Sequence, residues 1–221
     1  MTSWRRERDL LRCIRSPRVG EDELSRAVEA IRAGTPVILP TDTVYGLCVA
    51  PYEAEPVECL YRLKGRGARQ PTALLAVDLE VLLECVPELH GRSATAARAL
   101  LPGPYTLVLP NPARRFPWLA GTTPEAIGVR VPQLPGPAAR VLADVGAVAA
   151  TSANFPGGPD PRRLDEVPAA LREGAGAVVD GGELPGTPST VLDLTGPEPR
   201  VLREGAVPAV DALARVEAAL R

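Results

Sequence analysis

The 221-residue sequence predicts one α/β domain built on a twisted, mixed parallel and antiparallel sheet that is flanked by helices. Short apolar runs typical of buried strands alternate with segments of helical period, but without the regular strand–helix–strand repeat of an all-parallel sheet. Three of the expected strands cluster near the C-terminal end. Because no internal repeat and no long linker divides the chain, we expect a single domain over residues 21–221, after a loosely held, arginine-rich lead at 1–20.

The first half of the domain opens with a helix. Apolar residues recur at helical spacing from Leu24 to Ile31, and Gly34 suits the end of this helix. Pro56 suits the first turn of a second helix, which the glycines of residues 64–67 should end. In chain order we expect a strand at about 36–40, a strand at 46–49, a helix at 56–63, a loop at 64–67, a strand at 73–77, and helices near 78–86 and 92–101.

The second half begins where residues 102–104 (PGP) interrupt the chain. The elements that follow are short, as apolar runs of three to five residues predict. In chain order we expect strands at 105–109 and 127–131, a helix at 137–143, a strand at 147–150, a loop at 155–161, a helix near 164–173, strands at about 177–180, 190–194 and 200–203, and a closing helix from about 208.

The composition excludes several classes of protein. With 45% apolar residues the chain can bury a core, so disorder is not expected. No apolar run approaches the ~18 residues of a membrane span, and the charged residues 4–9 are not followed by the apolar core of a signal peptide. We therefore expect a cytoplasmic protein with no membrane partner. A net charge of −2 argues against the whole chain as a polyanion binder, although it is compatible with a local basic pocket.

Cysteine and histidine point away from two kinds of chemistry. The four cysteines show no Cys-x-x-Cys spacing, and a disulfide framework is not expected in a cytoplasmic chain of this size. His90 is the only histidine and lies in residues 87–91 (PELHG), which are typical of an exposed turn. A Ser-His-Asp triad and a histidine-based zinc site are therefore not expected, and we assign no metal-ligating residue.

Hydroxyl-rich segments stand at the ends of three apolar runs. Residues 41–47 (TDTVYGL) follow the run at 36–39, residues 151–154 (TSAN) follow the run at 148–150, and Ser189 and Thr190 open the next one. In open α/β sheets, ligands bind in the crevice beyond the carboxyl ends of strands. These segments therefore predict a polar pocket at one edge of the sheet.

Four basic residues stand where they can reach such a pocket. Lys64 and Arg66 flank a glycine at a helix end, Arg130 alternates with two valines in an apolar strand, and Arg203 ends a strand. An arginine within an apolar strand needs a carboxylate partner or an anionic ligand, and for Arg130 alone the two explanations are equally good. Four cations near hydroxyl-rich strand ends favour a phosphate or carboxylate site. The common glycine-rich nucleotide fingerprints are absent.

Eight short motifs occur in the order found in one known family. They are TDTVYGL at 41–47, Lys64-x-Arg66, PGPYTL at 102–107, GVRVP at 128–132, TSAN at 151–154, DGG at 180–182, STV at 189–191 and Leu202-Arg203-x-Gly205. Over residues 22–207 the chain thus resembles the YrdC/Sua5 family, the L-threonylcarbamoyladenylate synthases. Its length resembles the short form, which lacks the extra C-terminal domain of longer members.

The resemblance implies a YrdC-like fold and a nucleotidyltransferase activity. L-threonine, bicarbonate or carbon dioxide, and ATP with Mg²⁺ would give threonylcarbamoyl-AMP and pyrophosphate. The product would pass to the tRNA threonylcarbamoyl-transferase complex, which modifies adenosine 37 of tRNA. Such chemistry depends on holding anions in line and neutralising charge, which suits a pocket of cations and hydroxyls.

The resemblance also implies roles for residues. The ATP-binding set is Lys64, Arg66, Ser152, Asn154 and Arg203, with Lys64 and Arg66 as catalytic residues. The L-threonine-binding set is Thr41, Arg130, Thr151 and Ser189, with Arg130 pairing the amino-acid carboxylate.

Several motif residues have structural explanations of equal or greater weight. Asp42 is as well explained by a turn in which it bonds its own backbone as by a role in the site. Tyr45 is expected to pack in a wall, and residues 102–104 and 180–182 are expected to form turns.

The chain departs from the family pattern near its basic loop. Many relatives have proline where this chain has Gly67, lysine where it has Gln70, and, in longer members, histidine where it has Leu75. Arg69 could replace the charge of the missing lysine. These differences leave the phosphate contacts of residues 64–71 open.

Three alternatives remain at this stage. Related domains form carbamoyl-adenylate from carbamoyl phosphate, although within larger proteins. Some relatives have been regarded as RNA-binding proteins, and the neutral charge gives weak support for RNA binding. A paralogue without synthase activity is the third alternative, against which the intact Lys64-x-Arg66 and Ser152-x-Asn154 pairs argue.

Overall fold

The computed structural model describes residues 20–67, 69–134 and 136–221, so the lead predicted at 1–20 lies, except for Gly20, outside the described residues. Within them, the strands form one mixed sheet in the order β7-β1-β2-β6-β3-β5-β4-β8-β9, which confirms the predicted fold class. The strands are β1 (Val37–Pro40), β2 (Tyr45–Val49), β3 (Ala73–Ala76), β4 (Tyr105–Pro110), β5 (Ala126–Arg130), β6 (Ala147–Ser152), β7 (Ala177–Val178), β8 (Thr190–Asp193) and β9 (Arg200–Arg203).

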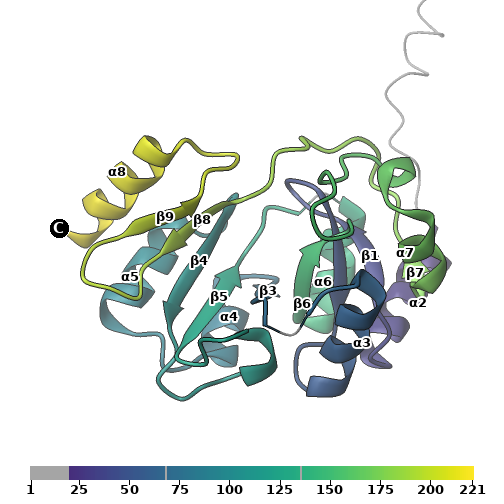
Figure 1. The fold of residues 1–221 in the computed structure, drawn as a ribbon, viewed down its shortest axis with the longest axis horizontal. Coiled ribbons are helices and arrows are strands. Elements are labelled where there is room, and N and C mark those ends of the chain that lie inside the picture. Colours follow the sequence, from purple (N-terminus) through teal and green to yellow (C-terminus); the bar gives the residue numbers. More distant parts are fainter. Residues whose placement is uncertain (1–19, 68, 135) are drawn as a thin grey trace, which may run out of the picture.

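Two pairs of helices cover the outer parts of the sheet, while α3 and α4 pack on its inner strands β2 and β3 (Figure 1). Helices α5 and α8 pack on each other beside β8 and β9, while α2 packs on α6 near β1 and β7. The helices are α2 (Glu21–Arg32), α3 (Ala54–Lys64), α4 (Leu79–Cys85), α5 (Gly91–Leu100), α6 (Gly136–Val145), α7 (Ala169–Gly174) and α8 (Ala209–Leu220), with short 3-10 turns η1 (Pro117–Leu119) and η2 (Leu164–Glu166). No helix in the described part of the chain is both long and apolar enough to cross a membrane.

The helix predicted near 164–173 is wrong as a single element. It divides into η2 and α7, with Val167 and Pro168 in extended conformations between them. Proline has no backbone N–H to continue a helix, and it disfavours helical geometry in the residue before it. The turn η1 was not expected from the sequence.

The two faces of the sheet are covered differently, and this creates the space for a site. Alternate residues of every long strand, such as Leu47, Leu74 and Leu107, point to the larger core cluster on one face. On the other face, a smaller core that includes Leu24, Val141 and Val148 fills only the region under α2 and α6. Side chains of β3, β4, β5 and β8 on that second face therefore remain open to a ligand.

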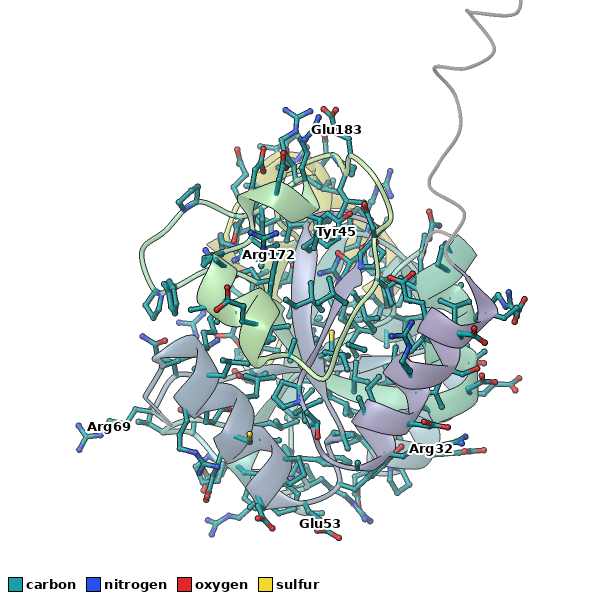
Figure 2. All side chains as sticks on the ribbon, turned by 90° about the vertical axis from the view of Figure 1, so that its right-hand side faces the viewer. Arg32, Tyr45, Glu53, Arg69, Arg172 and Glu183 are labelled. Carbon is teal, nitrogen blue, oxygen red and sulfur yellow. The ribbon has the colours of Figure 1, made fainter. Side chains whose placement is uncertain are left out.

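Tyr45 fixes residues 180–182 against the end of β2. Its side chain is fully buried, its hydroxyl lies 2.9 Å from Asp180 Oδ1 and 2.8 Å from the Gly182 carbonyl, and it accepts the Gly181 N–H at 3.0 Å. Figure 2 shows Tyr45 among the packed strands, whereas Arg32, Glu53 and Glu183 project at the periphery. The prediction of wall packing for Tyr45 is confirmed, whereas residues 180–182 form no backbone turn and are held by the Asp180 carboxylate, which accepts the Gly182 N–H at 2.9 Å.

Candidate functional site

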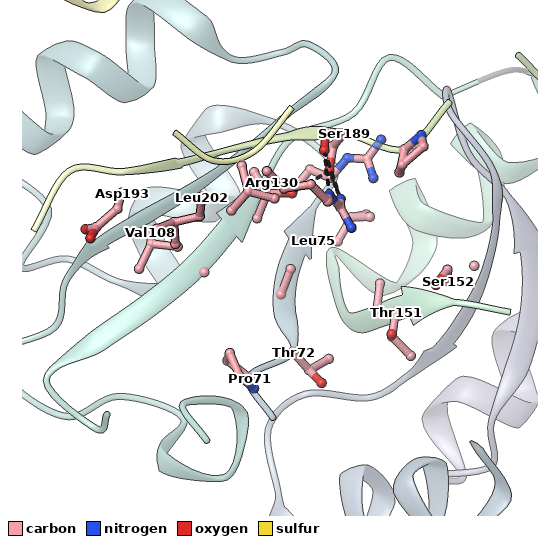
Figure 3. Close-up of a pocket in the computed structure, with 18 of the residues that line it drawn as sticks. Pro71, Thr72, Leu75, Val108, Arg130, Thr151, Ser152, Ser189, Asp193 and Leu202 are labelled. Atoms are coloured by element: carbon pink, nitrogen blue, oxygen red, sulfur yellow. Dashed lines mark hydrogen bonds between the residues drawn. The ribbon is translucent and has the colours of Figure 1, made fainter. Parts of the chain in front are cut away.

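A pocket of about 660 Å³ opens on the uncovered half of the sheet (Figure 3). Its floor consists of residues with little or no side chain, which leave the sheet surface bare: Gly46, Ala73, Ala126, Gly128 and Ala150. Ligand pockets of this size class are ordinary for cofactor-sized molecules. The floor comes from four strands that are neighbours in the sheet, β2, β6, β3 and β5, so their pairing is needed to form it.

Seven of the nine residues predicted for the site line this pocket. They are Thr41, Arg66, Arg130, Thr151, Ser152, Ser189 and Arg203. The other two contact the lining from behind: Lys64 Nζ donates to the Ser152 carbonyl, and Asn154 Oδ1 accepts from Ser152 Oγ at 2.7 Å. The structure thus brings the nine residues together, although it does not test their assigned roles.

Lys64 holds the turn at the end of β6. Its ammonium donates to the carbonyls of Ser152 (2.5 Å) and Asn154 (2.8 Å) and to Asn154 Oδ1 (2.9 Å), which engages all three hydrogens. Burial, reinforced by the nearby Arg66 charge, lowers the pKa of Lys64 to about 8, although Asp160 opposes the shift. A group that titrates this close to neutrality can change charge under ordinary assay conditions.

Arg66 reaches the pocket from the loop after α3. Its Nη1 donates to Thr151 Oγ1 at 2.8 Å, its Nη2 contacts the Pro71 carbonyl, and its guanidinium lies 6.0 Å from the Tyr61 ring centre. Its Nε is buried and has no hydrogen-bond partner among the described residues. Arg69, which could have replaced the missing lysine, is exposed and points away from the domain (Figure 2).

Arg130 forms the internal ion pair that the sequence left open. Its Nη2 contacts Asp42 Oδ1 and donates to Thr43 Oγ1 at 2.8 Å. Both members of the ion pair are only 10% exposed. Burial lowers the pKa of Arg130, Asp42 opposes that shift, and the neighbouring Arg203 charge adds to it.

Ser189 joins the two sides of the pocket at the start of β8. Its hydroxyl lies 2.8 Å from Thr106 Oγ1, and Arg203 Nη2 donates to the Ser189 carbonyl at 2.8 Å and to its hydroxyl at 3.2 Å. Gly205 makes this approach feasible, because a Cβ there would lie 2.2 Å from the Pro188 carbonyl oxygen. Ser189 and Arg203 are therefore held as one unit.

Thr41, and not Asp42, makes the turn before β2, although Thr41 also lines the pocket. The Thr41 hydroxyl makes the turn: it donates to the Val44 carbonyl at 2.7 Å and accepts the N–H groups of Thr43 and Val44 at 3.2 Å. Asp42 instead directs its carboxylate to Arg130 and to the N–H of Gln133. The turn explanation for Asp42 is thus wrong, because the threonine before it already fills that role.

Several lining residues were missed by the sequence analysis. Thr106 and Val108 line the pocket from β4, and their alternation with buried leucines in that strand was a usable signal. Thr72 also lines the pocket with a buried hydroxyl that lacks a partner among the described residues. Asp160 lies in a loop, where no periodicity could have identified it.

The charges in the lining favour an anionic ligand. Asp193 pairs with Arg200, and Arg130 pairs with Asp42. Arg66 and Arg203 have no carboxylate within 4 Å among the described residues, so they leave a positive excess in the pocket. Guanidinium groups and hydroxyls arranged in this way bind phosphate and carboxylate oxygens.

Comparisons of this chain with known proteins give matches to one family. A model of the Sua5/YciO/YrdC family, described as “Telomere recombination”, matches residues 29–205. The threonylcarbamoyl-AMP synthase of Halorhodospira halophila is 36% identical over 154 residues, which cover 70% of this chain and 78% of that protein.

Solved structures agree with the sequence comparison. The Pyrococcus abyssi Sua5 structure, complexed with L-threonine, superposes with a TM-score of 0.79 at 30% identity and covers 90% of this chain. This chain spans 58% of that longer protein. Escherichia coli YciO superposes with a TM-score of 0.76 at 26% identity, covering 88% of this chain and 94% of its own.

Proposed function

Because the chain belongs to the Sua5/YciO/YrdC family, we propose that it is a nucleotidyltransferase that forms L-threonylcarbamoyl-AMP and pyrophosphate from L-threonine, bicarbonate or carbon dioxide, and ATP. The observation that carries the proposal is the convergence of Arg66, Arg130 and Arg203 on one pocket, from the loop after α3, from β5 and from β9. The L-threonine in the Pyrococcus relative supports an amino-acid substrate.

The reaction needs positioning more than acid–base chemistry. The threonine amine adds to carbon dioxide to give a carbamate, whose oxygen then attacks the α-phosphorus of ATP while the bond to pyrophosphate breaks. Negative charge on the phosphoryl oxygens and on the leaving group must be neutralised in a fixed geometry. The guanidinium groups and hydroxyls of this pocket supply both requirements.

The lining offers contacts for both substrates, and the two sets meet at Thr151, whose hydroxyl accepts from Arg66 Nη1 at 2.8 Å. We assign Arg66 and Ser152 to the ATP phosphates, with Lys64 and Asn154 shaping the turn that carries Ser152. We assign Arg130, Thr151 and Ser189 to the amino acid and its carbamate, with Thr41 beside them. Arg203, which contacts Ser189 and lies near Arg130, stands where the carbamate would meet the phosphates.

Mg²⁺ would enter with ATP. This ion binds substrate phosphates and water together with one or two protein carboxylates, so it needs no all-protein cage. Asp160 fits that requirement, because its carboxylate lines the pocket, 3.3 Å from the Asn154 side-chain nitrogen. The bound ion would supply charge neutralisation on the phosphates.

The product is a mixed anhydride that water would hydrolyse. We therefore propose that it passes to the tRNA threonylcarbamoyl-transferase complex, which uses it to modify adenosine 37. RNA binding by this chain itself is not required for that transfer.

Pyrophosphate release tests the proposal. Purified protein is incubated with ATP, Mg²⁺ and bicarbonate, with or without L-threonine, and in a parallel arm with carbamoyl phosphate. We expect release that depends on threonine, and a fall of about a hundredfold or more in Arg66→Ala. Arg69→Ala, an exposed arginine of the same loop, is the matched control and should retain activity. Release with carbamoyl phosphate but not with threonine would overturn the proposal.

A further inference from the structure

Asp42 is anchored on both sides of its carboxylate. Its Oδ1 pairs with Arg130 Nη2, and its Oδ2 accepts the backbone N–H of Gln133 at 3.2 Å. The side chain is only 10% exposed. A carboxylate held at both oxygens in a buried position cannot swing aside to vacate the guanidinium, so it constrains where Arg130 points.

The remaining contacts of Arg130 come from one further residue. Thr43 Oγ1 accepts from the same amino group, Nη2, and is itself held 3.0 Å from the Thr41 hydroxyl. Both hydrogens of Nη2 are thus engaged by the protein. In contrast, Arg130 Nε is buried and has no partner among the described residues. The amino group Nη1 also makes no hydrogen bond to the described residues, and because Arg130 lines the pocket, this group is left for a ligand oxygen.

The local charge also leaves a place for one anion. Arg130 and Arg203 lie close enough for the charge of one to influence the other, and Ser189 contacts Arg203. Asp42 neutralises only one of these two cations. A single carboxylate from a ligand would balance the other.

We propose that Asp42 is a positioning residue for substrate binding: together with Thr43 it fixes one amino group of Arg130, so that the rest of the guanidinium is oriented to receive the carboxylate of the amino-acid substrate. This inference rests on the proposed function and adds to it a residue that does not itself touch the substrate. It differs from a purely structural ion pair, because it ties Asp42 to one chemical group of the ligand.

A ligand lacking that group provides the test. Dissociation constants for L-threonine, L-threoninamide and ATP are measured by calorimetry on the wild type and Asp42→Asn, well below their melting temperatures. We expect Asp42→Asn to weaken L-threonine binding by about tenfold to a hundredfold, the effect of a charged hydrogen bond. Binding of threoninamide, which has no carboxylate, and of ATP should change by less than about threefold.

Glu88→Gln is the matched control, because Glu88 is also a carboxylate held at both oxygens by an arginine, Arg115, but neither residue lines the pocket. It should leave the ratio of threonine to threoninamide affinity unchanged. If Asp42→Asn does not fold, Thr43→Val, which removes the other partner of Arg130 Nη2 and retains the Asp42 charge, must lower the same ratio.

The outcomes separate the competing explanations. An equal loss for threonine and threoninamide would make Asp42 a structural counter-ion and overturn the inference. Tighter threonine binding in Asp42→Asn would show that Asp42 competes with the substrate, which also overturns it. Absence of threonine binding to the wild type would refute the proposed function itself, and the role of Asp42 with it.

Discussion

We predict that Lys64 makes the affinity of the proposed ATP site depend on pH. The ammonium donates three hydrogen bonds to the Ser152–Asn154 turn, and burial lowers its pKa from the ordinary 10.5 to about 8. Loss of the proton removes one donor and the positive charge. Raising the pH through 8 should therefore loosen the turn that carries Ser152 and weaken ATP binding.

The expected size of the effect follows from that pKa. If only the protonated enzyme binds ATP well, the apparent dissociation constant grows by about tenfold between pH 7 and pH 9, because roughly one molecule in ten then retains the ammonium. Lys64→Met, which keeps the apolar stem but cannot titrate, should bind ATP more weakly at pH 7 and show no such slope. Calorimetric titration with ATP, without threonine or bicarbonate, keeps the titrations of those two substrates out of the measurement.

The contribution of Lys64 to the free energy of unfolding should rise with pH, whereas the affinity for ATP should fall. Because the pKa is lower in the folded than in the unfolded chain, the unfolded chain binds more protons between pH 8 and 10.5. The contribution of Lys64 to the free energy of unfolding therefore rises with pH across this window and is lost as the pH falls through 8. Denaturant titrations of wild type and Lys64→Met measure this difference. Equal pH slopes of ATP affinity in the two proteins would refute the reasoning.

Two glycines should separate folding from binding. Gly205→Ala places a Cβ 2.2 Å from the Pro188 carbonyl oxygen, so we expect it to lower the free energy of unfolding by about 2 kcal/mol or more, measured by denaturant unfolding. Gly136→Ala is the control, because there is open space around that glycine. Equal stability of the two variants would contradict the prediction. Gly128→Val projects into the pocket, where the nearest atom to a Cβ is 3.8 Å away. We expect it to retain the wild-type melting temperature and to weaken ATP binding by about tenfold or more, and unchanged affinity would show that the ligand does not lie over Gly128.

The elements of this fold were predictable where the sequence pattern was local. Leu24 to Ile31 form the expected amphipathic helix, and the alternation in β4 directs Leu107 and Leu109 into the core. The helix predicted near 164–173 was wrong because Pro168 interrupts a run of helix-forming residues. Both structures follow from local sequence rules, the apolar period in the first case and the effect of proline in the second.

Which residues belong to the site was easier to predict than the role of each residue in it. The order of the motifs led to a predicted site of nine residues, and seven of them line one pocket. The two explanations of Asp42 could not be separated from the sequence, because both Thr41 and Asp42 can form such a turn and only the tertiary position of Arg130 decides which one does. Likewise, Thr72 belongs to the pocket because β3 lies beside β5, which is a fact of topology and not of local pattern.

The order of strands in the sheet has a consequence for how binding and folding are coupled. Strand β1 pairs with β7, β2 with β6 and β4 with β8, so several neighbours in the sheet are separated by long stretches of chain. Loop closure over such separations makes folding slow, and local segments gain little by forming alone. Ser189 and Arg203 stand beside the pocket only where β8 is paired with β4 and β9 with β8. A nucleotide bound as proposed would contact residues that depend on these long-range pairings, so we expect its protection against unfolding to extend across the sheet.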